Sequence, residues 1–279
     1  MNKMNKLIFL IVILLSVALI SIYLMPINDI DIKSILLNNT KQLESYSLNV
    51  NLEYEITINN ESVSYNNKIF SHIDMDLINK LMFIDSSVIS LSSGQQKNIK
   101  TKTYVDGNLV YSKINGIWES FPITSDIWNN NDQIIDLISD IESSEIKRLS
   151  DEKLNGVYYY AFSLYPNMDL VKDKLIRDLG GDSNIVESEI LNYEKNILID
   201  KDTFNIVNVD ENVLIKFFPK DVRSINKIET LIVNYKNKLN FYNINNDIIF
   251  DLPSDLKLTL NGSDISDSPL VANVFAEIK

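Results

Sequence analysis

The sequence predicts an antiparallel α+β fold built around one large sheet. One observation is a strict alternation over residues 46–59, in which every second residue is apolar: Tyr46, Leu48, Val50, Leu52, Tyr54, Ile56 and Ile58. Alternation of this kind places the apolar side chains on one face of a β-strand. Fourteen residues at about 3.3 Å each exceed the usual strand, so the sheet must be large and must twist and curl. A second observation is that helical patterns interrupt runs of strands and do not alternate with single strands, which excludes a doubly wound fold.

The N-terminal segment, residues 1–26, is predicted to be an uncleaved signal anchor with a transmembrane helix at 7–24. The run from Leu7 to Leu24 is apolar except for two serines and Tyr23, and its length is close to the roughly 20 residues that cross a bilayer. The alternative is a cleaved signal peptide, but the run is followed by Tyr-Leu-Met-Pro and not by a small-x-small cleavage site. Lys3 and Lys6 should stay in the cytoplasm. We therefore expect a single-pass protein of the cell membrane with one extracytoplasmic domain, residues 27–279.

The order of elements in that domain follows from periodicity and turn residues. We expect a helix at 29–45, the long strand at 46–59, a returning strand at 62–76 and, less clearly separated from a helix, a strand at 76–91. A meander at 98–121, a helix at 125–144 and two strands within 143–163 follow. A short helix at 167–179, further strands within 188–257 and a strand or short helix at 270–278 complete the chain.

The meander has the most specific local signal. Its three strands are separated by Asp106-Gly107 and Asn115-Gly116. These dipeptides favour two-residue hairpin turns, because such turns need a positive φ. The sequence therefore fixes the positions of two turns in this segment.

The helix at 125–144 carries more apolar residues than a narrow stripe needs: Ile127, Trp128, Ile134, Ile135, Leu137, Ile138 and Ile141. These additional apolar residues have two interpretations, which the effects of truncation to alanine on stability and ligand binding would distinguish. Either all of them are core, or some of them border a ligand cavity.

Composition excludes several classes of function. The formal net charge of −12 disfavours a nucleic-acid partner, because no basic patch is available to release counterions. The absence of cysteine excludes disulfides, thiol nucleophiles, cysteine-based metal sites and a lipidated N-terminal cysteine. With His72 as the only histidine, neither a catalytic triad nor a zinc site is indicated, and we expect no enzyme activity, no metal and no cofactor.

The remaining polar and aromatic clusters have simple structural interpretations. The carboxylates of Asp140 and Glu142, and of Asp210 and Glu211, lack the spacing of a calcium loop and are interpreted as solvated faces. The run Tyr158–Tyr160 fits a strand buried on both faces or a platform on which a ligand stacks. Three Asn-x-Ser/Thr sequons, at Asn38, Asn60 and Asn261, permit glycosylation.

Several motifs in order resemble the LolA/LppX-like lipoprotein-carrier superfamily, in the style of membrane-anchored archaeal or Gram-positive members. They span most of residues 35–253: Leu43–Leu48, Tyr104–Gly107 with Val110-Tyr111, Asn115–Trp118, Leu154–Tyr160, Ile199–Asp202 and Phe250–Pro253. The resemblance implies a strongly curved antiparallel sheet, an unclosed β-barrel, with helices on the concave side. It also implies an apolar cavity that holds lipid or acyl chains.

The resemblance leads to two expectations for function. The first is a membrane-anchored protein that binds lipid or another hydrophobic ligand in the cavity of the curved sheet. The second is a cell-surface sensing or protein-interaction module with the same fold and no lipid. A cavity of at least about 300 Å³ would distinguish the first from the second. The candidate cavity residues are Ile134, Leu137, Ile138, Ile141, Leu175 and Leu179.

Overall fold

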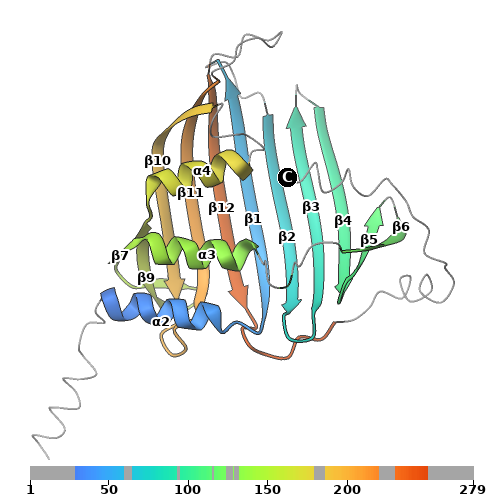
Figure 1. Ribbon diagram of the computed structural model, residues 1–279, viewed down its shortest axis with the longest axis horizontal. Coiled ribbons are helices and arrows are strands. Elements are labelled where there is room, and N and C mark those ends of the chain that lie inside the picture. The colour runs from blue at the N-terminus through green and yellow to red at the C-terminus, as the bar shows by residue number, and fades with distance from the viewer. Residues whose placement is uncertain are drawn as a thin grey trace, which may run out of the picture.

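The computed structural model describes residues 29–59, 65–92, 95–114, 116–123, 128, 132–178, 186–219 and 230–250 (Figure 1). The expected anchor at 1–26 and the expected element at 270–278 lie outside these residues. Among the helices that are described, none is long and apolar enough to span a bilayer.

The described residues form a 12-stranded antiparallel sheet in the order β6-β5-β4-β3-β2-β1-β12-β11-β10-β9-β7, with β8 paired to β9. The strands are β1 (Ser45–Ile58), β2 (Tyr65–Asp76), β3 (Leu81–Ser92), β4 (Gln95–Asp106), β5 (Leu109–Ile114), β6 (Ile117–Pro122), β7 (Glu145–Arg148), β8 (Glu152–Leu154), β9 (Val157–Tyr165), β10 (Val186–Ile199), β11 (Ile206–Pro219) and β12 (Leu231–Tyr242). Because β6 and β7 form the two ends of this order, the sheet is unclosed, as expected from the sequence.

Three helices lie on one face of the sheet: α2 (Asp29–Lys41), α3 (Asp132–Ser143) and α4 (Met168–Asp178). Figure 1 shows all three crossing the half of the sheet that contains β7 and β9–β12, with α2 nearest the strand ends. No described helix crosses β2–β6. We call the face that carries the helices the helix-side face.

The central strand β1 joins the two halves of the sheet. It pairs with β2 from Ser45 to Ile56 and with β12 from Ser47 to Ile58. The strand begins and ends one residue earlier than the alternation predicts. Tyr46 and Leu48, two residues of the apolar set, are fully buried on the helix-side face. The alternation therefore decides which face of every neighbouring strand is covered.

Two apolar clusters fill the space between the helices and the sheet. The lower cluster lies under α2 and α3 and includes Ile32, Tyr46, Leu137, Phe162 and Phe241. The upper cluster lies under α4 and includes Val171, Leu175, Val213, Ile215 and Val233.

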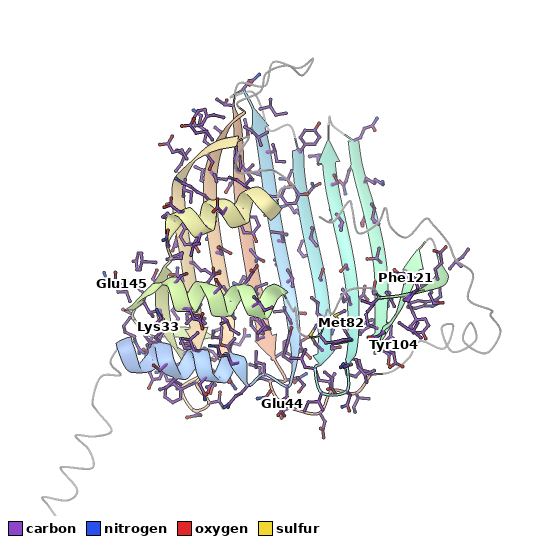
Figure 2. All side chains as sticks on the ribbon, in the orientation of Figure 1. Lys33, Glu44, Met82, Tyr104, Phe121 and Glu145 are labelled. Carbon is purple, nitrogen blue, oxygen red and sulfur yellow. The ribbon has the colours of Figure 1, made fainter. Side chains whose placement is uncertain are left out.

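A third cluster lies on the opposite face of the sheet. Tyr104 and Trp118 form its buried centre, and Phe83, Tyr111 and Phe250 pack around them. Phe83 and Met82 are neighbours on β3, so their side chains point to opposite faces of the sheet. Met82 packs against the lower cluster and Phe83 against the third cluster, so these two clusters lie on opposite faces. Met82 and Tyr104 both lie toward the lower ends of their strands in Figure 2.

Strand and turn predictions are confirmed in most of the described chain. The segment at 76–91 is a strand, β3, preceded by a turn. The two meander turns occur where expected, and Gly107 and Gly116 have φ values of +57° and +87°, which glycine adopts without strain. Residues 143–163 hold three strands, where two were expected.

The helix expected at 125–144 is wrong at its start. The described helix α3 begins at Asp132, and Ile127 lies outside the described residues. Trp128 lies in a turn, where its Nε1 donates to the carbonyl oxygen of Gly107 at 2.7 Å. Three consecutive asparagines, Asn129–Asn131, precede α3. Asparagine favours caps and turns over helix interiors, which explains the later start.

Strand β4 extends beyond its partner β5. Only Lys102–Asp106 pair with β5, so the first half of β4 has no partner on that side among the described strands. Every residue from Gln95 to Lys100 is exposed. This segment carries Lys97 and Lys100, and Lys102 follows at the first paired position.

The apolar face of β1 predicts a large difference between two substitutions. Leu48→Asp places a carboxylate in the fully buried lower cluster and should destabilise the fold by roughly 3–5 kcal/mol, or force the carboxylate to stay protonated. Asn51→Asp, at an exposed position of the same strand, should change stability by about 0.5 kcal/mol or less. Thermal unfolding monitored by circular dichroism checks both values. Equal melting temperatures for the two variants would show that β1 is not one-sided.

Candidate ligand-binding face

An apolar row crosses four strands on the helix-side face beside the helices. Leu52 of β1 is opposite Ile69 of β2, which is opposite Val88 of β3, which is opposite Ile99 of β4. Leu52, Ile69 and Val88 are half-buried, and Ile99 is 38% exposed. With strands about 4.8 Å apart, the row is about 14 Å long and one residue wide. We call Leu52, Ile69, Val88 and Ile99 the apolar row.

Polar side chains flank the apolar row on both sides. On one side Ser71 and Ser86 are opposite each other, and their hydroxyl oxygens lie 2.7 Å apart. On the other side Asn67 Nδ2 donates to the Tyr54 hydroxyl oxygen at 2.5 Å. The Asn67 Oδ1 atom is buried and accepts no hydrogen bond from the described residues. From β2 to β4 the row is therefore a narrow apolar strip between two bands of hydrogen-bonding groups, whereas on β1 Val50 connects it to the lower cluster.

The same register continues into a charged cluster beneath α3. Leu52 is opposite Asn237 of β12, Asn237 is opposite Glu211 of β11, and Glu211 is opposite Lys195 of β10. The Lys195 ammonium donates to Asp140 Oδ2 of α3 and lies 3.5 Å from Glu211 Oε2. All three side chains are nearly buried, so α3 is attached to the sheet by an ion pair in a poorly solvated setting.

Tyr193 completes the buried charged cluster, which consists of Asp140, Tyr193, Lys195 and Glu211. Its hydroxyl donates to Glu211 Oε1 at 3.1 Å. Burial, with the nearby carboxylates of Glu211 and Asp140, raises the pKa of Tyr193 far above its ordinary value. The phenol therefore stays protonated and acts as a hydrogen-bond donor at any physiological pH.

The buried charged cluster differs from what the sequence patterns predict. The interpretation of Asp140 and Glu211 as members of solvated faces is wrong, because both are nearly buried against Lys195. A signal was present in β10, where Tyr193, Lys195, Ile197 and Ile199 occupy alternate positions and so share one face. A lysine within an apolar face indicates a buried partner.

Of the six candidate cavity residues, five belong to the helices α3 and α4. Ile134, Leu137 and Ile141 are buried in the lower cluster, and Ile138 packs against it. Leu175 is buried in the upper cluster, and Leu179 lies outside the described residues. The structure therefore does not bring these residues together around one space.

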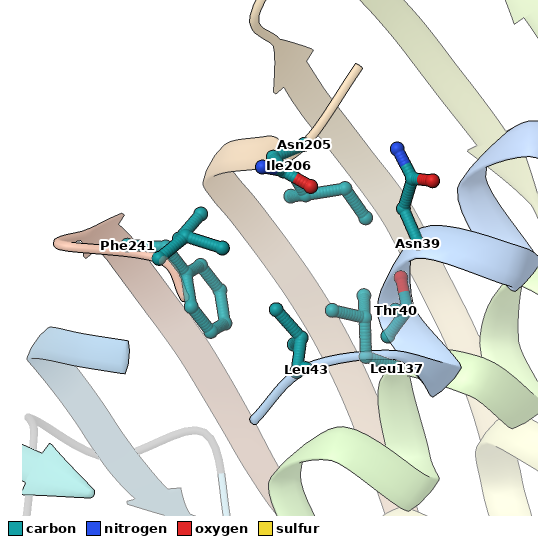
Figure 3. A pocket seen from close by; sticks show the side chains of 8 residues that line it. Asn39, Thr40, Leu43, Leu137, Asn205, Ile206 and Phe241 are labelled. Carbon is teal, nitrogen blue, oxygen red and sulfur yellow. The ribbon is translucent and has the colours of Figure 1, made fainter. Parts of the chain in front are cut away.

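The pocket next to α2 and α3 is small (Figure 3). It is lined by Asn39, Thr40, Leu43, Leu137, Asn205, Ile206, Phe241 and Ile244, and its volume of about 10 Å³ holds a single water molecule. Leu137 is the one candidate cavity residue in this lining. Side chains thus fill the space between α3 and the sheet.

Helix α3 is also attached to α2. Lys33 Nζ donates to the carbonyl oxygens of Glu142 and Ser144 at 2.8 and 2.9 Å, and Lys41 Nζ lies 2.8 Å from Glu142 Oε1. Lys33 lies on the α3 side of α2 in Figure 2. These contacts satisfy carbonyl groups at the C-terminal end of α3, where cations are favourable.

The opposite face of the sheet carries a polar network around His72. Asp74 Oδ2 lies 3.0 Å from His72 Nε2, and the Ser47 hydroxyl donates to Asp74 Oδ1 at 2.5 Å. The Tyr242 hydroxyl is 2.8 Å from His72 Nδ1. The serine thus bonds to the carboxylate and not to the imidazole, so these residues do not form a nucleophile–base pair. Within the described ranges, no group of three or more histidine and carboxylate side chains is placed to hold a metal ion.

Known proteins similar to this chain are found among solved structures. No family model matches the chain, and no curated protein matches it. Similar solved structures include the lipoprotein LppX from Mycobacterium tuberculosis, with 13% identity, a TM-score of 0.41 and coverage of 80% of this chain and 100% of LppX. LprF from Mycobacterium bovis has 11% identity, a TM-score of 0.45 and coverage of 80% and 95%. An outer-membrane lipoprotein-sorting protein domain from Vibrio parahaemolyticus has 12% identity, a TM-score of 0.23 and coverage of 84% and 100%.

These structures belong to the group that the sequence motifs resemble, so the neighbours of this chain are LppX- and LolA-like. At such low identity and TM-score, the likeness assigns neither a ligand nor a functional residue to this chain.

The packing of α3 predicts unequal effects of truncation along one helix. Ile141→Ala removes a fully buried side chain from the lower cluster and should cost about 2–5 kcal/mol. Ile135→Ala, at an exposed position of the same helix, should change stability by about 0.5 kcal/mol or less. Denaturant unfolding measures both, and a small effect of Ile141→Ala would mean that α3 does not pack as described.

The buried charged cluster predicts that Lys195 is needed to neutralise its two carboxylates. Lys195→Met leaves Asp140 and Glu211 buried without their cation and should destabilise the fold by roughly 3–5 kcal/mol. The triple variant Lys195→Met/Asp140→Asn/Glu211→Gln removes the uncompensated charges and should regain much of this loss. Unfolding free energies of the two variants provide the test, and no difference between them would exclude a charge effect.

Proposed function

We propose that this chain is a membrane-anchored extracytoplasmic protein that binds lipid or another hydrophobic ligand on the helix-side face of β1–β4. The observation that carries the proposal is the apolar row. Its four aliphatic side chains are aligned by register across adjacent strands, and no described helix covers them. A contiguous apolar surface left by the fold is the feature expected of a site for an apolar ligand.

The dimensions of the apolar row favour a slender ligand. A strip one residue wide and about 14 Å long matches a single extended acyl chain better than a bulky ring system. Hydrogen-bonding groups on both sides, including Asn67 with its unpaired Oδ1 atom and the Ser71–Ser86 pair, supply partners for polar atoms near the chain. Lys97 of β4 lies one row from Ile99 on the same face and provides a cation for an acidic head group.

The proposed site lies beside the helices and not beneath them. Beneath α2 and α3 the lower cluster leaves room for one water molecule. A ligand on the apolar row therefore needs no opening of α3, which the buried charged cluster and the lower cluster hold in place. This differs from the cavity that the family resemblance implies.

The alternative is a cell-surface sensing or protein-interaction module, in which an apolar segment of another protein covers the apolar row. The small pocket beside α2 and α3 favours it, because a volume of about 10 Å³ is far below the roughly 300 Å³ of a ligand cavity. Enzyme activity is not part of either proposal.

The proposal predicts that uptake of a fluorescent fatty acid depends on Ile99. Ile99→Asp adds a charge to the 38% exposed end of the apolar row and should weaken uptake at least about tenfold. The control is Phe70→Asp, a substitution at a 42% exposed apolar position on the opposite face of β2, which should leave uptake unchanged. Fluorescence titration of the delipidated full chain in lipid-free amphipol gives both affinities.

Two outcomes would contradict the lipid proposal. If the delipidated wild-type chain takes up no fatty acid or phospholipid probe, the interaction-module alternative replaces it. Equal weakening by Ile99→Asp and Phe70→Asp would move the site away from the apolar row. Mass spectrometry of lipids extracted with the protein from its native membrane identifies the ligand class independently.

A further inference from the structure

The β8–β9 hairpin projects from the edge of the sheet that α2 crosses. Tyr160 of β9 is opposite Ile199, the last residue of β10, so Val157 lies three residues beyond the end of β10. The neighbouring turn after β10 is linked to α2, because Asn39 Nδ2 donates to the carbonyl oxygen of Thr203 at 3.0 Å. The hairpin, this turn and α2 therefore share one edge of the molecule (Figure 1).

The tip of the hairpin exposes aromatic and aliphatic groups between two cations. Tyr158 is 56% exposed and Val157 is 51% exposed. The ammonium groups of Lys153 and Lys201 lie 5.2 and 5.9 Å from the centre of the Tyr158 ring. The interpretation of Tyr158–Tyr160 as a strand buried on both faces is thus wrong at its start, since β9 becomes fully buried only from Ala161. We call Lys153, Val157, Tyr158 and Lys201 the hairpin patch.

Ion pairs and ring contacts hold the hairpin patch in position. Asp151 accepts hydrogen bonds from Lys201 and Arg148. The hydrogen bond from Lys201, together with the nearby charges, lowers the pKa of Asp151. The Arg148 guanidinium lies over the rings of Tyr160 and Phe162, at 4.2 and 5.0 Å. These contacts connect the exposed tip to the lower cluster, which includes Phe162.

Chain length places this edge close to the membrane if residues 7–24 form the anchor. Only residues 25–28 separate Leu24 from the first residue of α2, Asp29. Five Cα–Cα steps span at most about 18 Å. The edge that α2 crosses thus cannot be far from the lipid head groups.

We propose that the hairpin patch docks onto the outer surface of the same membrane that holds the anchor. The inference rests on the anchor in the proposed function, but not on the apolar row. Tyrosine prefers the membrane interface, where its ring contacts acyl chains and its hydroxyl stays hydrated. Lysine extends its ammonium to the phosphate groups while its stem covers apolar surface.

Charge gives the docking an orientation. The chain has a formal net charge of −12, so most of its surface is repelled by anionic lipids. In the hairpin patch, Lys153 and Tyr158 are paired across β8 and β9 and share one face, whereas the exposed carboxylate of Glu152 is paired with Tyr159 on the other face. Val157 is paired with Leu154 directly beside the turn of the hairpin, on the same face as Glu152. The domain therefore meets the membrane with the tip of the hairpin, where Val157 lies, and with the Lys153–Tyr158 face turned toward the bilayer. This fixed orientation keeps the far ends of β1–β4 away from the bilayer.

The test uses site-specific fluorescence on the full chain in nanodiscs that contain phosphatidylglycerol. Because the chain has no cysteine, each introduced cysteine carries a single label. Val157→Cys with a polarity-sensitive fluorophore should be quenched several-fold more strongly by head-group nitroxide lipids than Leu91→Cys. Leu91 is 44% exposed near the opposite end of the strands, on β3. Adding Lys153→Gln and Tyr158→Ser to Val157→Cys should lower its quenching to the Leu91→Cys level.

Three results would overturn the inference. The first is equal quenching at positions 157 and 91. The second is a label at position 157 that is blue-shifted but not quenched, which would indicate a protein partner. The third is failure of the full chain to co-elute with nanodiscs. Fatty-acid uptake measured on the same variants after delipidation separates the two proposals. The Lys153→Gln/Tyr158→Ser variant should retain uptake, and Ile99→Asp should retain quenching at position 157.

Discussion

The structure depends on β1 having one apolar face and one polar face. This strand pairs along nearly its whole length with β2 on one side and β12 on the other, so it connects the meander half of the sheet to the half under the helices. A shift by one residue would turn Tyr46 and Leu48 out of the lower cluster and bring Ser47 and Asn49 in. The register of β1 therefore fixes the lower cluster, the apolar row and the His72 network at the same time.

Along one row of paired residues, the two halves of the helix-side face differ in polarity: one half carries charged and polar side chains and the other carries apolar side chains. Under α3 this row contains Lys195, Glu211 and Asn237, although the surroundings are buried. Beside the helices it contains Leu52, Ile69, Val88 and Ile99, although no described helix covers them. Ordinary core formation would favour the reverse arrangement. The inversion is the main reason to assign function to the apolar row, because packing within the described residues does not explain it.

Local signals in the sequence were sufficient for most of the sheet. Alternation predicted β1 to within one residue at each end, and Asp106-Gly107 and Asn115-Gly116 predicted the meander turns. The start of α3 was missed because apolar spacing at Ile127 and Trp128 continued the helical pattern through three asparagines. The pairing of β1 with β12 joins residues that are nearly 200 positions apart, so no local pattern encodes it. The apolar row depends on the register of the consecutive strands β1–β4, and the buried charged cluster depends on the position of α3 over β10 and β11. Only Lys195, within the apolar face of β10, gave a local signal for either of them.

The unpaired half of β4 affects how molecules of this protein meet one another. The free edge of a strand offers unpaired backbone groups to any other strand and is a common route to aggregation. Here the edge carries Lys97 and Lys100, and Lys102 follows at the first position that pairs with β5. If two copies aligned their β4 edges antiparallel, these ammonium groups would be brought close together and would repel each other across the new ladder. The lysines therefore discourage the sheet from growing by edge-to-edge association, and molecules of this protein can remain separate at high local density.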